Sequence, residues 1–96
     1  MTNDGVSLIA AERQRQIEVE RYTIEYDAPY VDEELARAAT AYLHHYLWPT
    51  SYSLEPPVVW PWSVKAWKPS ENNRVRDLVK AGALIAAEID RLRRTP

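Results

Sequence analysis

The sequence predicts an all-α domain of three helices, with a long loop rich in tryptophan and proline before the last helix. Three segments carry apolar residues at three- and four-residue spacing, which is typical of helices packed on a core. Glycine occurs only twice, and five of the seven prolines fall between the second and third segments. With 96 residues, the chain has the size of a single domain, 1–96.

The first helix is predicted over about residues 7–22. Asp4 or Ser7 can cap its start, because short polar side chains accept hydrogen bonds from the first free N–H groups of a helix. Leu8, Ile9 and Ile17 form a sparse apolar stripe, and helix-forming residues without proline fill the rest.

An extended connection at 23–31 precedes the second helix, predicted over about 33–48. Asp32 is the expected N-cap, and Glu33 and Glu34 place negative charge where the helix dipole favours it. Pro49 ends the helix. Its apolar positions are Leu35, Ala38, Ala39, Tyr42, Leu43, Tyr46 and Leu47.

The loop 49–69 contains three of the four tryptophans, Trp60, Trp62 and Trp67. Its prolines exclude a central strand, and its tryptophans are not typical of a flexible linker. We therefore expect an ordered loop that lies across the helices and covers packed indole rings.

The third helix is predicted over about 71–94, with Ser70 as its cap. Gly82 lies inside its apolar stripe, where glycine costs about 1 kcal/mol relative to alanine. A close approach of another helix or of the loop would compensate for that cost. The stripe consists of Val75, Leu78, Val79, Gly82, Ile85, Ala86, Ile89 and Leu92.

Composition excludes several classes of protein. Without cysteine there are no disulfides, thiolate zinc sites or cysteine nucleophiles, and two glycines cannot form a glycine-rich phosphate loop. No apolar run reaches the length of a membrane span and no leader is present, so we expect a cytoplasmic protein of a bacterial host. A net charge of −2 argues against direct DNA binding.

The candidate binding site is a basic edge beside the tryptophans. Cations next to indole rings suit a flat anionic ligand such as a nucleotide, or an acidic protein surface. The alternative is an ordinary solvated basic face. The candidate residues are Trp60, Trp62, Trp67, Lys68, Arg74, Arg76 and Lys80.

The sequence offers no clear catalytic or metal site, so we expect no catalytic residue, metal or cofactor. His44 and His45 are adjacent on a helix and point about 100° apart, so they cannot chelate one ion together. An acidic cluster could hold a divalent cation, although caps and exposed charge explain it equally. The cluster comprises Glu20, Glu25, Asp27, Asp32, Glu33 and Glu34.

Three stretches resemble a family of small, functionally uncharacterised phage and prophage proteins: the segments 9–17, 60–69 and 76–92. They contain Glu12-Arg13-Gln14-Arg15-Gln16, Trp60-Pro61-Trp62 with Trp67-Lys68-Pro69, and Arg76-Asp77-Leu78-Val79-Lys80-Ala81-Gly82. The family also carries an H-D-D-x-H motif, whose histidines this chain lacks. A catalytic metal site in relatives would therefore not extend to this protein.

The resemblance implies a phage accessory protein that acts by binding, such as an anti-CRISPR-like inhibitor or a protein that sequesters a nucleotide signal. Its partner would be a host defence protein or a nucleotide-like small molecule, and its long third helix favours a homo-oligomer. The alternative is an enzyme similar to the magnesium-dependent all-α nucleotide pyrophosphohydrolases. The carboxylate spacing of those enzymes is not kept at Glu12, Glu18 and Glu20.

Overall fold

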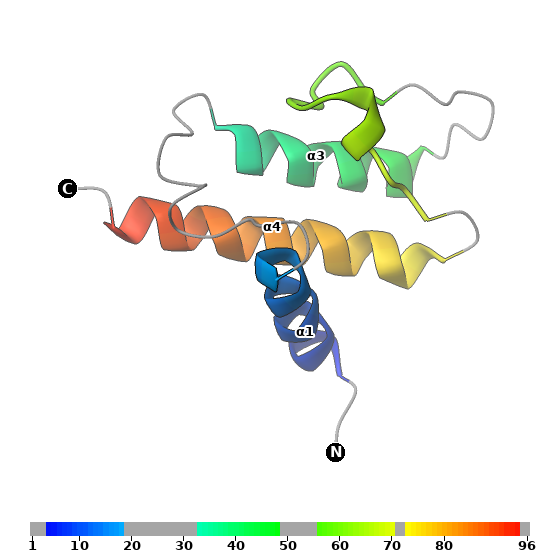
Figure 1. Ribbon diagram of the computed structural model, residues 1–96. Coiled ribbons are helices and arrows are strands. Elements are labelled where there is room, and N and C mark those ends of the chain that lie inside the picture. Colours follow the sequence, from blue (N-terminus) through cyan, green and yellow to red (C-terminus); the bar gives the residue numbers. More distant parts are fainter. Residues whose placement is uncertain (1–3, 19–32, 49–55, 71–72, 95–96) are drawn as a thin grey trace.

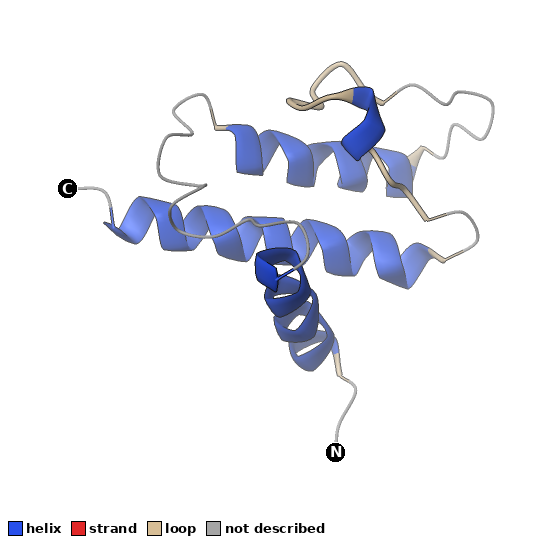
Figure 2. Cartoon of the chain, in the orientation of Figure 1, coloured by secondary structure: helices blue, strands red, loops and turns tan. Residues whose placement is uncertain are grey.

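The computed structural model describes residues 4–18, 33–48, 56–70 and 73–94, and it confirms the all-α prediction. Three α-helices are present in this part of the chain: α1 (Gly5–Glu18), α3 (Glu34–Leu47) and α4 (Arg74–Arg94). A short 3₁₀ helix, η1 (Val64–Ala66), interrupts the loop before α4. The described residues contain no strand (Figure 2).

The longest helix, α4, is the element on which the others pack. In Figure 1, α3 runs alongside α4, α1 crosses near its middle, and the loop with η1 lies over α3. None of the helices in the described part of the chain combines the length and apolarity that crossing a membrane requires.

Two helix starts show how side chains satisfy the free N–H groups. The Asp4 carboxylate accepts a hydrogen bond from the Ser7 N–H (2.9 Å), as the sequence predicts. For α4 the predicted cap is wrong: Asn73, not Ser70, accepts from the Arg76 N–H (3.1 Å), so the helix begins at Arg74. The predicted cap Asp32 and the predicted end of the first helix, beyond Glu18, lie outside the described residues.

The core between α3 and α4 is rich in alanine. Because alanine has a small side chain, the two helix backbones can approach closely. Leu35 and Leu84 are the largest fully buried side chains, and Tyr42 joins them from α3. The buried alanines of this cluster are Ala38, Ala39, Ala41, Ala81 and Ala87.

Trp60 closes one side of this core. It is 7% exposed, and its Nε1–H donates to the Ser63 carbonyl (2.9 Å). Its ring packs edge to face on the Tyr42 ring, with the ring centres 5.7 Å apart. The centre of the Trp67 ring lies 4.9 Å from the centre of the Trp60 ring. Trp60 is therefore part of the scaffold, while Trp62 and Trp67 are half-buried against it.

Gly82 is the point of close approach that the sequence predicts. Ile9 of α1 packs directly on it: a Cβ placed at Gly82 would lie 2.6 Å from Ile9 Cδ1 and 2.9 Å from Ile9 Cγ1. The absence of a side chain at Gly82 therefore lets α1 cross α4 closely.

The predicted apolar stripe of α4 does not face the core as expected. Val79 is buried, but the other large members of the stripe are 37–59% exposed. The core instead uses the neighbouring face of α4, because its alanines let α3 approach more closely than branched side chains would. The exposed members are Val75, Leu78, Ile85, Ile89 and Leu92.

Candidate functional site

The centre of the candidate site is a buried carboxylate, Glu12, between α1 and α4. Its side chain is 1% exposed. Arg15 donates two hydrogen bonds to it, from Nε at 2.9 Å and from Nη2 at 2.8 Å. Arg76 of α4 approaches with Nη1 at 2.7 Å from Oε1. One carboxylate therefore fixes two guanidinium groups that come from different helices.

The charge state of Glu12 follows from these partners. Burial raises the pKa of Glu12, but hydrogen bonds from Arg15 and the positive charge of Arg76 together outweigh it and hold the pKa below its ordinary value. The carboxylate is thus ionised at neutral pH. It compensates part of the charge of the two arginines.

A cleft of about 340 Å³ opens beside this ion cluster, between α1 and the first turns of α4. Its volume lies within the range of about 300–1,000 Å³ that is usual for small-molecule sites. Aliphatic side chains form much of its wall, and Glu12, Arg15, Arg76 and the Asn73 amide provide the polar groups. The lining residues are Leu8, Ala11, Glu12, Arg15, Asn73, Val75, Arg76 and Val79.

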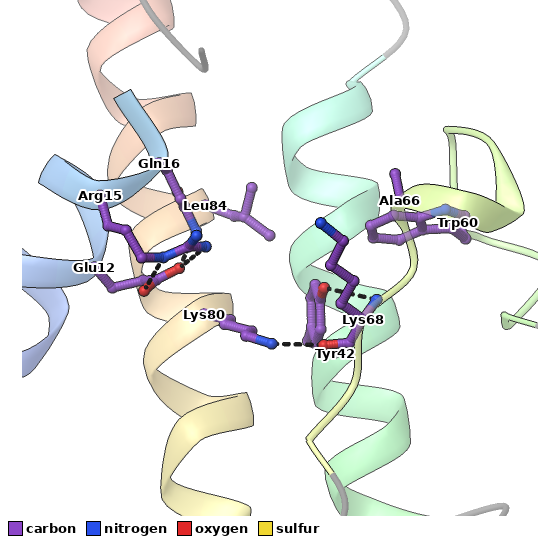
Figure 3. Close-up of a pocket in the computed structure, with 9 residues that line it drawn as sticks. All are labelled: Glu12, Arg15, Gln16, Tyr42, Trp60, Ala66, Lys68, Lys80 and Leu84. Carbon is purple, nitrogen blue, oxygen red and sulfur yellow. Dashed lines mark hydrogen bonds and ion pairs between the residues drawn. The ribbon is translucent and has the colours of Figure 1, made fainter. Parts of the chain in front are cut away.

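A second, smaller cavity of about 30 Å³ also borders Glu12 and Arg15. It has room for one or two water molecules. Figure 3 shows Glu12, Arg15 and Gln16 from α1 on one side and Tyr42, Trp60 and Lys68 on the other, with Lys80 between them. Three cationic side chains and one carboxylate surround it, so its lining is positively charged.

Lys80 spans the space between α4 and the loop. Its ammonium group donates to the Lys68 carbonyl (2.5 Å) and lies 5.5 Å from the centre of the Tyr42 ring. Burial, followed by the charge of Arg76, lowers the pKa of Lys80. Tyr42 OH accepts from the Lys68 N–H (3.4 Å), so the same stretch of backbone is held from two helices.

Gln16 adds a buried polar group to the small cavity. Gln16 is 3% exposed, and its Nε2 donates a hydrogen bond to Glu12 Oε2 (3.2 Å). Its Oε1 has no hydrogen-bond partner among the described residues. A buried acceptor of this kind is usually satisfied by water or ligand, so the cavity suits a bound hydrogen-bond donor.

Asp77 holds the end of the loop in place. Its Oδ1 accepts from the Ser70 N–H (2.8 Å), and its Oδ2 lies 3.1 Å from His45 Nδ1. The two histidines point in different directions from one helix and have different surroundings: His45 packs against Asp77, and His44 is exposed beside Trp48.

The seven predicted binding residues do not gather at one place. Trp60, Lys68 and Lys80 line the small cavity, whereas Arg76 lines the larger cleft. Arg74 lies over the Tyr46 ring, 4.4 Å from its centre. Trp62 and Trp67 pack against the core and line neither space.

Sequence reasoning missed the binding candidates that α1 supplies. The sequence analysis names Arg15 and Gln16 only within a family-like motif, and Glu12 there and in the pyrophosphohydrolase alternative, although their spacing places all three on one side of a helix. Charged residues at three- and four-residue spacing on an otherwise weakly apolar helix are the signal that points to them. Tyr42 and Asn73 carry no comparable signal.

No group of three metal-ligating side chains occurs within the residues that the structure describes. Four members of the predicted acidic cluster lie outside them, namely Glu20, Glu25, Asp27 and Asp32. Glu33, which has a positive φ of 61°, and Glu34 stand at the start of α3. A hydrogen bond with Glu88, followed by the charge of Glu88, raises the pKa of Glu33.

Comparison of the chain with models of protein families, with curated proteins and with solved structures finds no significant match.

Proposed function

We propose that this protein binds a small organic anion of nucleotide type in the cleft between α1 and α4, and that it acts by binding, without catalysis. The observation that carries the proposal is the pair of guanidinium groups, Arg15 and Arg76, which Glu12 fixes at the floor of an apolar-walled cleft.

The charge balance favours an anion. Among the described residues that line the cleft, Arg15 and Arg76 are cationic and Glu12 is the carboxylate, and the two arginine side chains are 37% and 35% exposed, so a ligand can reach them. A guanidinium carries five N–H donors. Arg76 contacts Glu12 through Nη1. A planar donor group held in this way is suited to phosphate or carboxylate oxygens.

The shape of the cleft favours an organic anion over a simple ion. Leu8, Val75 and Val79 offer apolar surface close to the arginines, and the Asn73 amide can both donate and accept hydrogen bonds. A nucleotide combines an anionic part with a flat, weakly polar ring that such surface can cover. The volume matches a ligand of that size.

The chemistry of the cleft favours binding over hydrolysis. Magnesium-dependent phosphate chemistry needs carboxylates that face the metal. Glu12, the carboxylate of this cleft, instead faces two arginines. A pyrophosphohydrolase-like enzyme remains the competing hypothesis, and its carboxylates would come from the acidic cluster.

The resemblance to phage proteins supports a role in counter-defence. A protein that binds a nucleotide-type signal could sequester that signal from a host defence enzyme. An anti-CRISPR-like protein would bind an acidic protein surface instead. Small-ligand binding in the absence of any host protein distinguishes the first role from the second.

A thermal-shift screen of purified protein tests the proposal. The panel contains nucleoside mono- and triphosphates and cyclic nucleotides, each with and without magnesium, because a bound ligand raises stability by mass action. We expect a nucleotide to raise the melting temperature without metal, in wild type and in Arg94→Ala but not in Arg76→Ala. Absence of any shift, or magnesium-dependent turnover of a nucleotide, would overturn the proposal.

A further inference from the structure

The small cavity beside Gln16 is a second candidate binding site, apart from the cleft in which we place the nucleotide. Glu12 and Arg15 border both spaces, whereas Gln16 and Lys80 line the cavity and not the cleft. Gln16 comes from α1 and Lys80 from α4, and Trp60 of the loop lies across from them (Figure 3). The chemistry of the Gln16 and Lys80 side chains decides what the cavity can hold.

The Gln16 amide offers an acceptor, and its orientation is fixed. Gln16 is 3% exposed, and its amide lies 3.2 Å from Glu12 Oε2. Because an ionised carboxylate only accepts hydrogen bonds, the amide nitrogen must face Glu12, and the amide oxygen is left on the other side. Gln16 Oε1 has no hydrogen-bond partner within the residues that the structure describes. A buried acceptor costs free energy unless a donor meets it, so the occupant of the cavity must carry an N–H or O–H group.

The charges around the cavity favour an anion. Three of the described residues that line it are cationic, Arg15, Lys68 and Lys80. The carboxylate of Glu12 also borders it, but its negative charge is shared by Arg15 and Arg76. The Lys68 carbonyl fixes the Lys80 ammonium beside the cavity (2.5 Å). Burial and the charge of Arg76 lower the pKa of Lys80, so a negative charge in the cavity would stabilise its charged form.

One kind of ligand combines a donor with a negative charge in so small a space. We propose that the small cavity binds a monovalent oxyanion that carries one O–H group, with bicarbonate as the simplest example. The O–H group donates to Gln16 Oε1, and the charged oxygens face Lys80 and Arg15. Bicarbonate occupies about as much space as two water molecules, which is the room that the cavity offers.

Water and simple anions meet only part of these requirements. A water molecule gives Gln16 Oε1 a donor but leaves the cations of the cavity without a counter-charge. Nitrate has the planar shape and the charge of bicarbonate but no O–H group, so it leaves Gln16 Oε1 without a donor. A comparison of bicarbonate with nitrate therefore isolates the hydrogen bond to Gln16.

An NMR titration of isotope-labelled protein, without nucleotide, makes this comparison. Sodium bicarbonate and sodium nitrate are added in separate experiments at equal ionic strength and at a slightly alkaline pH, where bicarbonate is the main form. We expect bicarbonate to shift the Gln16 side-chain amide and Trp60 indole N–H signals in a saturable way. Nitrate should bind about tenfold more weakly, the factor that one hydrogen bond usually contributes. Equal affinity for the two anions, or no saturable shift with bicarbonate, would overturn the proposal.

Three variants test the assigned side chains, with the Trp60 indole signal as the readout. Lys80→Met removes a cation that lines the cavity and should weaken bicarbonate binding by about tenfold to a hundredfold. Lys65→Met, on the exposed helix η1, loses the same charge and should bind as wild type. Gln16→Leu should bind bicarbonate no better than nitrate.

Similar binding in Lys80→Met and Lys65→Met, or a preference for bicarbonate that Gln16→Leu retains, would contradict the proposed contacts. If a variant fails to fold, the comparison of the two anions on the wild-type protein still decides.

Discussion

Glu12 and Arg76 join the first helix to the last: Glu12 Oε1 lies 2.7 Å from Arg76 Nη1, and the Glu12 side chain is 1% exposed. We expect this contact to stabilise the fold and also to support the proposed ligand binding. It fixes α1 across α4 and orients a guanidinium group toward the cleft. Its loss should therefore be visible both in unfolding and in ligand binding.

The first prediction concerns the stability of the protein at low pH. Because the folded-state pKa of Glu12 lies below its unfolded value, its stabilising effect is present at neutral pH and is lost as the pH falls through the folded-state pKa. Glu12→Gln should lower the free energy of unfolding by about 1–3 kcal/mol near neutral pH. Urea denaturation should show this difference shrinking as the pH falls below the ordinary carboxyl pKa of 4.5, and a constant or growing difference would contradict the assignment.

The second prediction concerns the crossing of α1 and α4. Gly82→Ala adds helix propensity of about 1 kcal/mol, but its Cβ would meet Ile9. In an Ile9→Ala background the substitution should therefore stabilise the protein by about 1 kcal/mol. In the wild-type background it should give less or become destabilising. Equal effects in the two backgrounds, measured as a double-mutant cycle, would show that Ile9 does not pack on Gly82.

The third prediction separates scaffold tryptophan from surface tryptophan. Trp60→Ala removes a buried ring and should destabilise the protein by about 3–5 kcal/mol. Trp48 is 60% exposed, so Trp48→Ala should change stability by only about 0.5 kcal/mol. Urea unfolding of both variants makes the comparison. A similar small effect in both would place Trp60 outside the core.

The sequence predicts where the helices lie in the chain better than it predicts which side of each helix faces the core. Asp4 as a cap, the close approach at Gly82 and the different directions of His44 and His45 follow from local chemistry and spacing. The orientation of α4 does not, because the helix carries two apolar rows: alanines such as Ala81 and Ala87, and the larger residues of the predicted stripe. Only the packing against α3 decides between them.

For the candidate site as well, the sequence identifies some of the residues but not the contacts that they make. Arg76 and Lys80 could be recognised as basic residues near tryptophans, but Arg76 pairs with Glu12 of α1, and Lys80 contacts the Lys68 carbonyl of the loop and the Tyr42 ring of α3. Nothing local to Arg76 indicates that it pairs with Glu12, since the two residues lie far apart in the chain and meet only when α1 crosses α4. The tryptophans were grouped with these cations by sequence proximity, whereas Trp62 and Trp67 serve the core.

Isothermal titration calorimetry tests the central claim most directly, as the fourth prediction. It compares nucleotide binding to Arg76→Ala and Arg94→Ala, two variants of α4 that lose the same charge, without divalent metal. Arg76 lines the cleft, whereas Arg94 is exposed at the end of the helix. We expect Arg94→Ala to bind as wild type and Arg76→Ala to bind more weakly by about 1.5–3 kcal/mol, the usual range for a hydrogen bond to a charged group. Equal affinity in the two variants would contradict a binding site in the cleft.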